Sequence, residues 1–334
     1  MVLGVLVTLA HSVICAQTCT TQARMTGDVR NALSDVALSL AQAVQQADSS
    51  KVQGMTIAEF ADASAFAPTM SLLQSTSSHL ANDALRVTQI YELDASGRGA
   101  SDTSDADFSC PLIGTTAETD FSISGLPRGL YGFAMVEATG GRPWLLSFLL
   151  RRDGGEWKLA GFYPRATTAA GHDGVWYWNS ARTYAKADEL WLAWIFYGEA
   201  AELLRPANFV TSSNLDRLLS ERHASAPSEL VGGIGPSDPL VVKSTDSKGA
   251  VTEYRLNNLS MAESPDGKEM NLIVHLRQDD VSNPGVVSDR SKAAAQALLD
   301  AHMELRQAFH QVWVFAGSKG QEPLVTEQTI SDIP

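Results

Sequence analysis

The sequence predicts an α+β fold, and changes in the spacing of its apolar residues carry that prediction. Over residues 18–47, apolar side chains recur at three- and four-residue steps, as on one face of an α-helix. After about residue 110 the step falls to two, which is the period of strands with one buried face. Helical spacing returns at residues 174–206 and at 289–309, with short strand patterns around the second of these. We therefore expect helices packed on antiparallel sheets.

Length and composition bound the class of protein. A chain of 334 residues with 44% hydrophobic content has room for two or three domains. Charged residues make up 19%, which excludes a coiled coil and a disordered acidic protein. Lysine and arginine number 25 against 38 acidic residues, which gives a net charge of -13. Such a surface repels phosphate, so we expect no nucleic-acid partner and no binding to anionic membranes.

The amino terminus carries a short apolar run. Residues 1–16, MVLGVLVTLAHSVICA, resemble a secretory signal peptide cleaved after Ala16, although no Lys or Arg precedes Arg24. The run is shorter than the roughly 20 apolar residues of a membrane-spanning helix. We therefore expect a periplasmic or secreted protein with no stable membrane insertion. A buried amino-terminal helix and a lipid anchor at Cys15 are the alternatives.

Two cysteines remain after such a cleavage, Cys19 and Cys110. In an oxidising compartment they could pair as a disulfide that ties the amino-terminal segment to the first domain. Two free thiols fit the spacing equally well. Three cysteines in the whole chain are too few for a zinc ribbon or finger.

The predicted first domain covers residues 17–168 and begins with helices. Residues 55–75 hold one or two short helices, which we expect to break near Pro68. A strand follows at Leu85–Leu93, and residues 94–107 read as an exposed Gly/Ser/Asp-rich loop. The apolar face of the first long helix comprises Val29, Leu33, Val36, Ala37, Leu40 and Val44.

A run of short strands completes this domain. Gly140-Gly141 and Gly154-Gly155 mark two hairpin turns between them. The predicted strands are Phe121–Ile123, Leu130–Glu137, Pro143–Arg151 and Glu156–Tyr163. The order of the elements, with helices followed by a meander of strands that ends in WKLAGFY, resembles that of the cystatin-like or NTF2-like α+β roll. The resemblance covers roughly residues 25–165. The resemblance implies a curved sheet around a helix, and often an apolar pocket that some members use for catalysis.

A second resemblance covers residues 174–206. These residues resemble a single tetratricopeptide-type helical hairpin, which implies a connector spanning residues 169–223 rather than a repeat array. Ala181 replaces the usual glycine of that motif, and Pro206 falls one place late. A short amphipathic segment, Ser213 to Glu221, follows the hairpin. The large and small packing positions of the motif are Tyr177, Ala181, Tyr184, Ala193, Tyr197 and Ala200.

The predicted third part, residues 224–334, is a smaller α+β domain. It opens with a Gly/Pro/Ser-rich linker at 224–239. A helix with an apolar stripe is predicted over Asp289 to Phe309. The strands expected in its antiparallel sheet are Leu240–Ser244, Val251–Leu256, Asn271–Leu276, Gln311–Ala316 and Pro323–Gln328. The three-part order as a whole resembles that of secreted bacterial proteins.

The first candidate site is the interior of the roll. A carboxylate or His in an apolar pocket can act as a general base. The polar candidates are His79, Tyr91, Asp94, Asp120 and Tyr131. Structural roles explain several of them equally well: Asp94 as a turn cap, Tyr131 as a packed ring, and His79 at an exposed helix start. We keep Tyr91 and Tyr131 as candidate ligand-binding residues.

The second candidate site is the junction before the helical hairpin. His172 and Asp173 lie between glycines and precede Trp176 and Trp178. The four could form a proton relay or a ring-stacking surface for a ligand. The alternative is that Asp173 caps a helix and the rings pack in a core. The same two roles, ligand stacking and core packing, are open to the five aromatic residues of the hairpin. They are Trp176, Trp178, Trp191, Trp194 and Phe196.

Metal and nucleotide motifs are missing from the sequence. His302 and His310 lie eight apart on one predicted helix, but two His need a third ligand to bind zinc. The segment Glu221-Arg222-His223 and His275 also show no spacing that would bring their side chains to one metal ion. There is no HExxH, GxSxG, GxxxxGK[ST] or GxGxxG motif in a fitting context. We expect no metal site and no cofactor.

The function that fits these features best is non-enzymatic. The chain is predicted to be an exported binding or scaffold protein that holds an apolar small molecule or a protein segment on the concave face of the roll, together with the aromatic hairpin. The alternative is a small hydrolase, isomerase or dehydratase that acts in the roll's pocket. A third hypothesis is assembly as a homodimer through the sheets.

Overall fold

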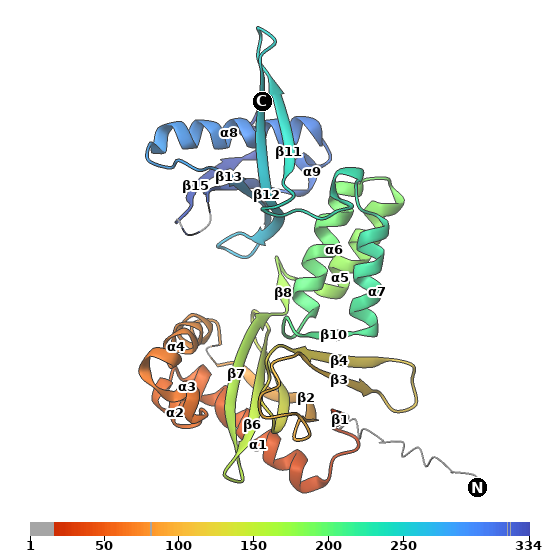
Figure 1. The fold of residues 1–334 in the computed structure, drawn as a ribbon. Coiled ribbons are helices and arrows are strands. Elements are labelled where there is room, and N and C mark those ends of the chain that lie inside the picture. Colours follow the sequence, from red (N-terminus) through yellow and green to blue (C-terminus); the bar gives the residue numbers. More distant parts are fainter. Residues whose placement is uncertain (1–16, 81, 319, 321) are drawn as a thin grey trace, which may run out of the picture. The chain divides into compact units, whose positions relative to one another are not determined.

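The fold is α+β, as the sequence predicts (Figure 1). The structure, a computed structural model, describes residues 17–80, 82–318, 320 and 322–334. The predicted signal segment, residues 1–16 with Cys15, lies outside the described residues. The chain divides into two compact units. The first comprises residues up to 81 with 85–137 and 146–163, and the second comprises 82–84, 138–145 and 164–334. The expected division into roll, hairpin and carboxy-terminal domain stays a prediction.

The first unit is built on a five-stranded sheet in the order β1-β2-β5-β6-β7. The strand β1 at its edge, which the sequence did not predict, pairs antiparallel with β2 and sets Cys19 opposite Leu93. The strands β2, β5 and β6 match their predicted bounds within two residues, and β7 extends three residues past its predicted end at Tyr163. The bounds are β1 Thr18–Thr21, β2 Ala84–Asp94, β5 Leu130–Thr139, β6 Trp144–Asp153 and β7 Glu156–Ala166.

The helix α1 (Gly27–Gln45) packs its predicted apolar face on this sheet. Thr26 caps the helix by accepting a hydrogen bond from the backbone N–H of Val29. Its fully buried side chains include Leu33, Ala37, Leu40 and Val44. At Gly132 of β5, a Cβ atom would clash with the side chain of Leu33, so the glycine allows the helix to approach the strand.

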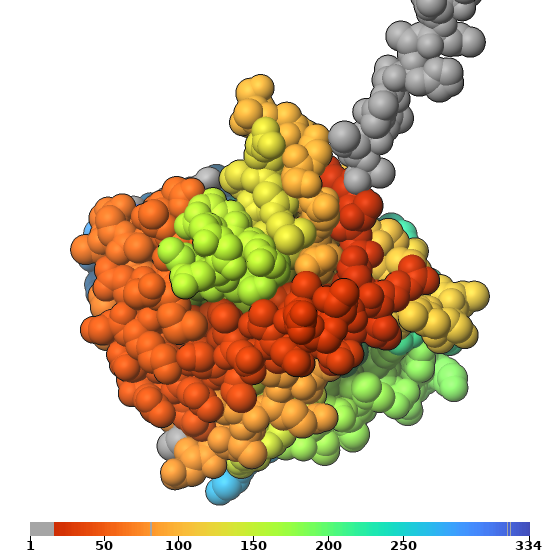
Figure 2. All heavy atoms as spheres, turned by 90° about the horizontal axis from the view of Figure 1, so that it is seen from below, coloured from red at the N-terminus to blue at the C-terminus, as the bar shows by residue number. Residues whose placement is uncertain are grey.

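Three shorter helices follow α1: α2 (Ser49–Gly54), α3 (Ala58–Ala61) and α4 (Ala63–Ser77). Figure 2 shows them in orange beside α1 in red. The predicted break near Pro68 is wrong, since Pro68 lies inside α4. Asp62 caps α4 with hydrogen bonds from two backbone N–H groups, and Pro68 removes only one donor of the helix. The predicted helix start at His79 is also wrong, because His79 follows the end of α4.

The segment between α2 and α3 is tied to β7. The backbone N–H of Ile57 donates to the carbonyl of Leu159 at 3.0 Å, and the N–H of Leu159 donates to that of Met55 at 2.8 Å. This pairing holds α3 beside the last strand of the sheet. It therefore fixes where the side chains of α3 point.

A hairpin of β3 (Ala106–Pro111) and β4 (Glu118–Ile123) completes the first unit. The sequence assigned the start of β3 to a loop. Cys110 on β3 forms a disulfide with Cys19 on β1, with 5.3 Å between their Cα atoms. Phe121 of β4 packs edge-on against Phe133 of β5 and Tyr91 of β2, with ring centroids 5.2 and 5.1 Å apart. Disulfide and rings together hold the hairpin on the sheet.

In the second unit, three helices precede the carboxy-terminal sheet: α5 (Gly174–Lys186), α6 (Leu190–Leu204) and α7 (Ser213–Ala224). Leu192 to Tyr197 are all buried. A helix that is apolar all round must be covered on every side, and α6 packs against α5, α7 and the strand β12. The short strands β8 (Thr168–Ala169), β9 (His172–Asp173) and β10 (Val210–Ser212) flank these helices in sequence.

A five-stranded sheet, in the order β11-β12-β13-β14-β15, completes the second unit. The expectation that this sheet is antiparallel throughout is wrong at one place, since β13 and β14 run parallel. The helix α8 (Pro284–Ala301) lies between them in sequence and allows the crossover that a parallel pair needs. The bounds are β11 Leu240–Thr245, β12 Val251–Glu263, β13 Met270–Arg277, β14 Gln311–Gly317 and β15 Leu324–Thr329.

The predicted helix over Asp289 to Phe309 is two helices, α8 and the short α9 (Leu305–Ala308). His302 leaves the helical conformation and stacks on Trp191 of α6, with ring centroids 3.7 Å apart. His302 and His310 are therefore not on one helix face. Among the helices of the described residues, none has the length and apolar content to cross a membrane.

Candidate functional site

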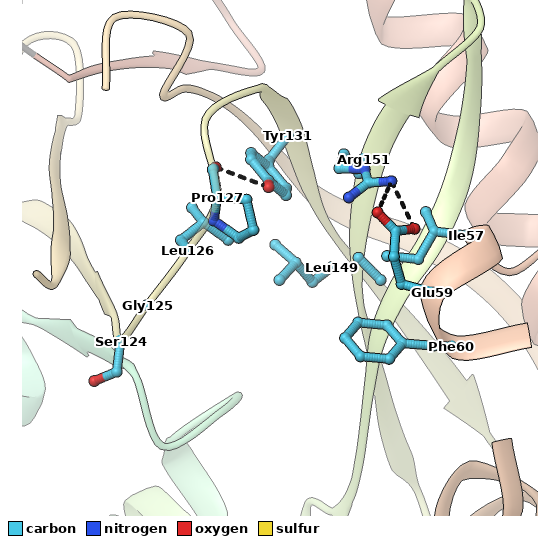
Figure 3. Close-up of a pocket in the computed structure, with 11 residues that line it drawn as sticks. Ile57, Glu59, Phe60, Ser124, Gly125, Leu126, Pro127, Tyr131, Leu149 and Arg151 are labelled. Carbon is cyan, nitrogen blue, oxygen red and sulfur yellow. Dashed lines mark hydrogen bonds and ion pairs between the residues drawn. The ribbon is translucent and has the colours of Figure 1, made fainter. Parts of the chain in front are cut away.

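The candidate site is a pocket of about 230 Å³ in the first unit (Figure 3). It lies between the β4–β5 loop, the short helix α3 and the strands β5, β6 and β7. Most of its wall is aliphatic or aromatic carbon. The lining residues are Ile57, Glu59, Phe60, Ser124, Gly125, Leu126, Pro127, Tyr131, Leu149, Arg151 and Ala160.

The pocket opens on the face of the sheet opposite α1. Neighbouring residues of a strand point to opposite faces, and Gly132 faces Leu33 of α1, so Tyr131 faces the other way. The helix therefore occupies the face that we expected to hold a ligand. The space that remains is on the outer face, where α3 and the β4–β5 loop form its walls.

Glu59 and Arg151 form the charged part of the pocket. The terminal nitrogen Nη2 of Arg151 lies 2.8 Å from one carboxylate oxygen of Glu59 and 2.9 Å from the other. The backbone N–H of Glu59 and the guanidinium of Arg151 together hold the pKa of this carboxyl below its usual value. Glu59 is therefore an ionised group that is already paired, and sequence reasoning did not single out either residue.

Tyr131 contributes its ring to the pocket wall, and its hydroxyl is satisfied within the protein. The hydroxyl donates to the backbone carbonyl of Pro127 at 2.9 Å, and the residue is 1% exposed. Burial raises the pKa of Tyr131. Tyr91, the other predicted ligand-binding residue of the roll, donates to the hydroxyl of Thr119 at 3.1 Å and is not part of the pocket wall.

The remaining roll candidates lie outside the pocket. Asp94 accepts hydrogen bonds from the backbone N–H and the hydroxyl of Ser96, so it caps a turn. Asp120 lies on β4 opposite Ser109. His79 follows α4. The structure thus brings one of the five predicted polar residues, Tyr131, to the pocket.

The junction residues of the second unit form a ring stack and a helix cap. His172 stacks on Trp176, with ring centroids 3.7 Å apart and planes within 10° of parallel. Asp173 accepts the backbone N–H of Trp176 at 2.8 Å and caps α5. The stack is at the surface, since Trp176 is 41% exposed.

Trp178 belongs to a different cluster, centred on Glu221 of α7. The indole N–H of Trp178 donates to Glu221 at 2.7 Å. Arg182 donates to both carboxylate oxygens of Glu221, at 2.7 and 2.8 Å, and its guanidinium lies 4.4 Å from the Trp178 ring centroid. The Arg182 hydrogen bonds, with those of Trp178 and Arg217, lower the pKa of Glu221 to about 2. The cluster locks α5 to α7.

The other aromatic residues of the hairpin are core residues. Trp191, Trp194 and Phe196 are each 5–6% exposed, within the core that the helices share with the carboxy-terminal sheet. Of the five predicted rings, only Trp176 is more than a third exposed. The rings therefore form no continuous ring-stacking surface for a ligand.

His275 of the second unit is partly buried and packed against a ring. His275 stacks on Phe315 with ring centroids 5.2 Å apart, and burial lowers its pKa. Within the described ranges, no group of three or more His, Cys, Asp or Glu side chains could hold a metal ion.

Comparisons with known proteins add no relative. No family model, no curated protein and no solved structure matches this chain. The resemblances to a cystatin-like or NTF2-like roll and to a tetratricopeptide-type hairpin therefore stay predictions.

Proposed function

We propose that this chain is an exported, non-enzymatic binding protein whose first unit holds a small apolar group in the pocket beside α3. The observation that supports the proposal most directly is the pocket's wall: apolar side chains surround it, and its one acid and one base are paired with each other. Sites for small molecules have this composition, with few polar groups that fix orientation.

The size of the pocket limits the ligand. A volume of about 230 Å³ is below the range of roughly 300–1,000 Å³ that drug-sized ligands occupy. One aromatic ring or a short branched acyl chain fits this space. Phe60 of α3, which is 48% exposed, supplies ring surface that such a ligand would cover.

Catalysis in the roll is the less favoured function. A general base needs a carboxylate or His with a pKa near neutrality, whereas Glu59 is paired and its pKa is lowered. Tyr131 is held by Pro127 and its pKa is raised, so its proton stays in place. The groups that line this pocket can orient a ligand but have no proton to exchange near neutral pH.

Two features support export. Residues 1–16 have the composition of a secretory signal. Cys19 and Cys110 form a disulfide between two segments of the same unit. Disulfides persist in oxidising compartments and are rare in the cytosol.

The experiment is a calorimetric titration of the chain with toluene, a probe of one ring. We expect a dissociation constant on the order of 1 mM, the affinity that seven carbon atoms can supply. Phe60→Ala should weaken toluene binding roughly fivefold, since it removes ring surface that the ligand covers. Met303→Ala is the control, because Met303 is 59% exposed in the second unit.

Two results would overturn the proposal. One is the absence of toluene binding at its solubility limit. The other is equal affinity in the wild type, Phe60→Ala and Met303→Ala, which would show that toluene binds elsewhere.

A further inference from the structure

A second cavity, of about 370 Å³, lies within the second unit between α6, α7 and β12. Its walls are partly apolar, from Ile195, Leu259 and Met261, and partly polar. The proposed function does not use it. The complete lining is Ile195, Gly198, Glu199, Glu202, Arg222, Asn258, Leu259, Ser260 and Met261.

Glu199 supplies a carboxyl group without a partner. Within the described residues, its carboxylate has neither a hydrogen bond nor an ion pair. Burial, followed by the nearby charges of Glu202 and Glu263, raises the pKa of Glu199 to about 7. Burial with no cation beside the carboxylate therefore brings the pKa of Glu199 close to neutral pH.

Arg222 supplies a guanidinium whose outer nitrogens have no carboxylate partner in the described chain. Its Nε–H donates to the backbone carbonyl of Trp194 at 3.1 Å, and the guanidinium carbon lies 3.9 Å from that residue's ring centroid. Its Nη2 extends over Gly198, 3.2 Å from where a Cβ would be. Burial lowers the pKa of Arg222 to about 10, so the group stays charged at neutral pH.

The third charged residue of the lining, Glu202, is already paired. Arg165 donates to it at 2.8 Å, and its side chain is 62% exposed. Glu199 and Arg222 are therefore the two charged groups of the lining that have no ion-pair partner among the described residues. They have opposite charge, and they form no ion pair with each other.

We propose that this cavity binds a small zwitterion, a free amino acid or short peptide, with its ammonium group on Glu199 and its carboxylate on Arg222. Glu199 and Arg222 are both partly buried. Withdrawing a charge from water costs free energy unless the charge is paired, so a ligand that supplies both missing partners should bind more tightly than one with a single charge. The guanidinium fork suits a carboxylate. Ile195, Leu259 and Met261 then contact the ligand's carbon chain.

Binding should release protons. The charged groups near Glu199 are Glu202 on its own helix and Glu263 on β12, and Arg222 of α7 lines the same cavity. Arg165 is bonded to Glu202 and Arg142 to Glu263, and the titratable Tyr177 of α5 also interacts with Glu199. Near neutral pH a fraction of the Glu199 groups carries a proton. An ammonium group stabilises the ionised form, so its arrival should expel that fraction of a proton from each site.

The test is calorimetry near pH 7 in two buffers of different ionisation enthalpy. The probes are β-alanine, γ-aminobutyrate and 6-aminohexanoate, with butylamine and butyrate as singly charged controls. We expect at least one zwitterion to bind at least tenfold more tightly than either control, with proton release. Glu199→Gln should weaken binding at least tenfold and abolish the release, and Arg222→Lys should weaken it while keeping the charge. The exposed Glu327→Gln is the matched control and should change nothing.

The proposal is overturned if no probe of the series binds below 10 mM, or if butylamine or butyrate binds as tightly as the best zwitterion. It is also overturned if Glu199→Gln, shown to be folded by its thermal transition, binds and releases protons as the wild type does.

Discussion

One terminal nitrogen of Arg151 contacts both carboxylate oxygens of Glu59, at 2.8 and 2.9 Å. The pair joins the strand β6 to the four-residue helix α3. It closes one side of the apolar pocket and leaves the pocket no free carboxylate. This pairing is why the pocket fits a ligand that is recognised by shape and apolar contact.

Toluene binding should not depend on pH between about 5 and 8. Glu59 has a lowered pKa and stays ionised across this range, and Tyr131 has a raised pKa and stays protonated. The measurement is the dissociation constant at several pH values. A change of more than about threefold would show that a titrating group faces the ligand, as the catalytic alternative requires.

Gly132→Ala should destabilise the first unit by about 1–3 kcal/mol, the usual cost of forcing atoms into a packed core. The added methyl would clash with a terminal methyl of Leu33, which is fully buried. Urea denaturation measures the change. Gly27→Ala is the control, since a Cβ there meets no atom within 4 Å. An unchanged midpoint for Gly132→Ala would contradict the described contact between α1 and β5.

Glu221→Gln should destabilise the second unit by about 1–3 kcal/mol, because it weakens charge-assisted hydrogen bonds from Arg182 and leaves Trp178 and Arg217 with a weaker acceptor. Thermal denaturation near pH 7 measures the effect. Glu327→Gln, on an exposed face of β15, serves as the control and should be neutral. Equal losses for the two variants would contradict the role of this cluster.

The same cluster predicts a pH dependence. The pKa of Glu221 is about 2 in the folded protein and near 4.5 when unfolded. Its stabilisation is therefore complete above pH about 4.5 and is lost as pH falls toward about 2. The difference in unfolding free energy between wild type and Glu221→Gln should shrink over that window. A difference that stays constant down to the lowest pH at which both chains fold would contradict the assigned ion pairs.

Removal of the disulfide should cost about 2–4 kcal/mol of stability, a typical value for a bond that closes a long loop. Cys19 and Cys110 are 91 residues apart in sequence. The double variant Cys19→Ala, Cys110→Ala should match the reduced wild type and should not respond to reductant. Mass spectrometry with and without reductant checks the bond through the mass of two hydrogen atoms, and a mass without that difference would contradict it.

The sequence predicted best the strands whose apolar runs end at turn glycines. Leu130–Thr139 and Trp144–Asp153 are buried on both faces along most of their length, so a nearly continuous apolar run, and not a strict alternation, marks them in the sequence. It missed Thr18–Thr21, a polar run whose strand conformation comes from pairing with β2 and the bond from Cys19. Such tertiary partners leave no local pattern.

The site was less predictable than the fold. Tyr131 was found because an aromatic hydroxyl on a buried strand stands out. Glu59 and Arg151 are 92 residues apart, and nothing in either local pattern says that they meet. The burial of Trp191 and Trp194 could be read from the apolar run on α6, which is apolar on all sides.

The most direct test of the account is where toluene binds. Nuclear Overhauser contacts between toluene protons and assigned methyl groups locate it on the intact chain. The account predicts contacts to the methyl groups of Ile57, Leu126 and Leu149, all of which line the pocket. Contacts confined to methyl groups of the second unit, or to Leu33 and Leu40 on the buried face of α1, would contradict it.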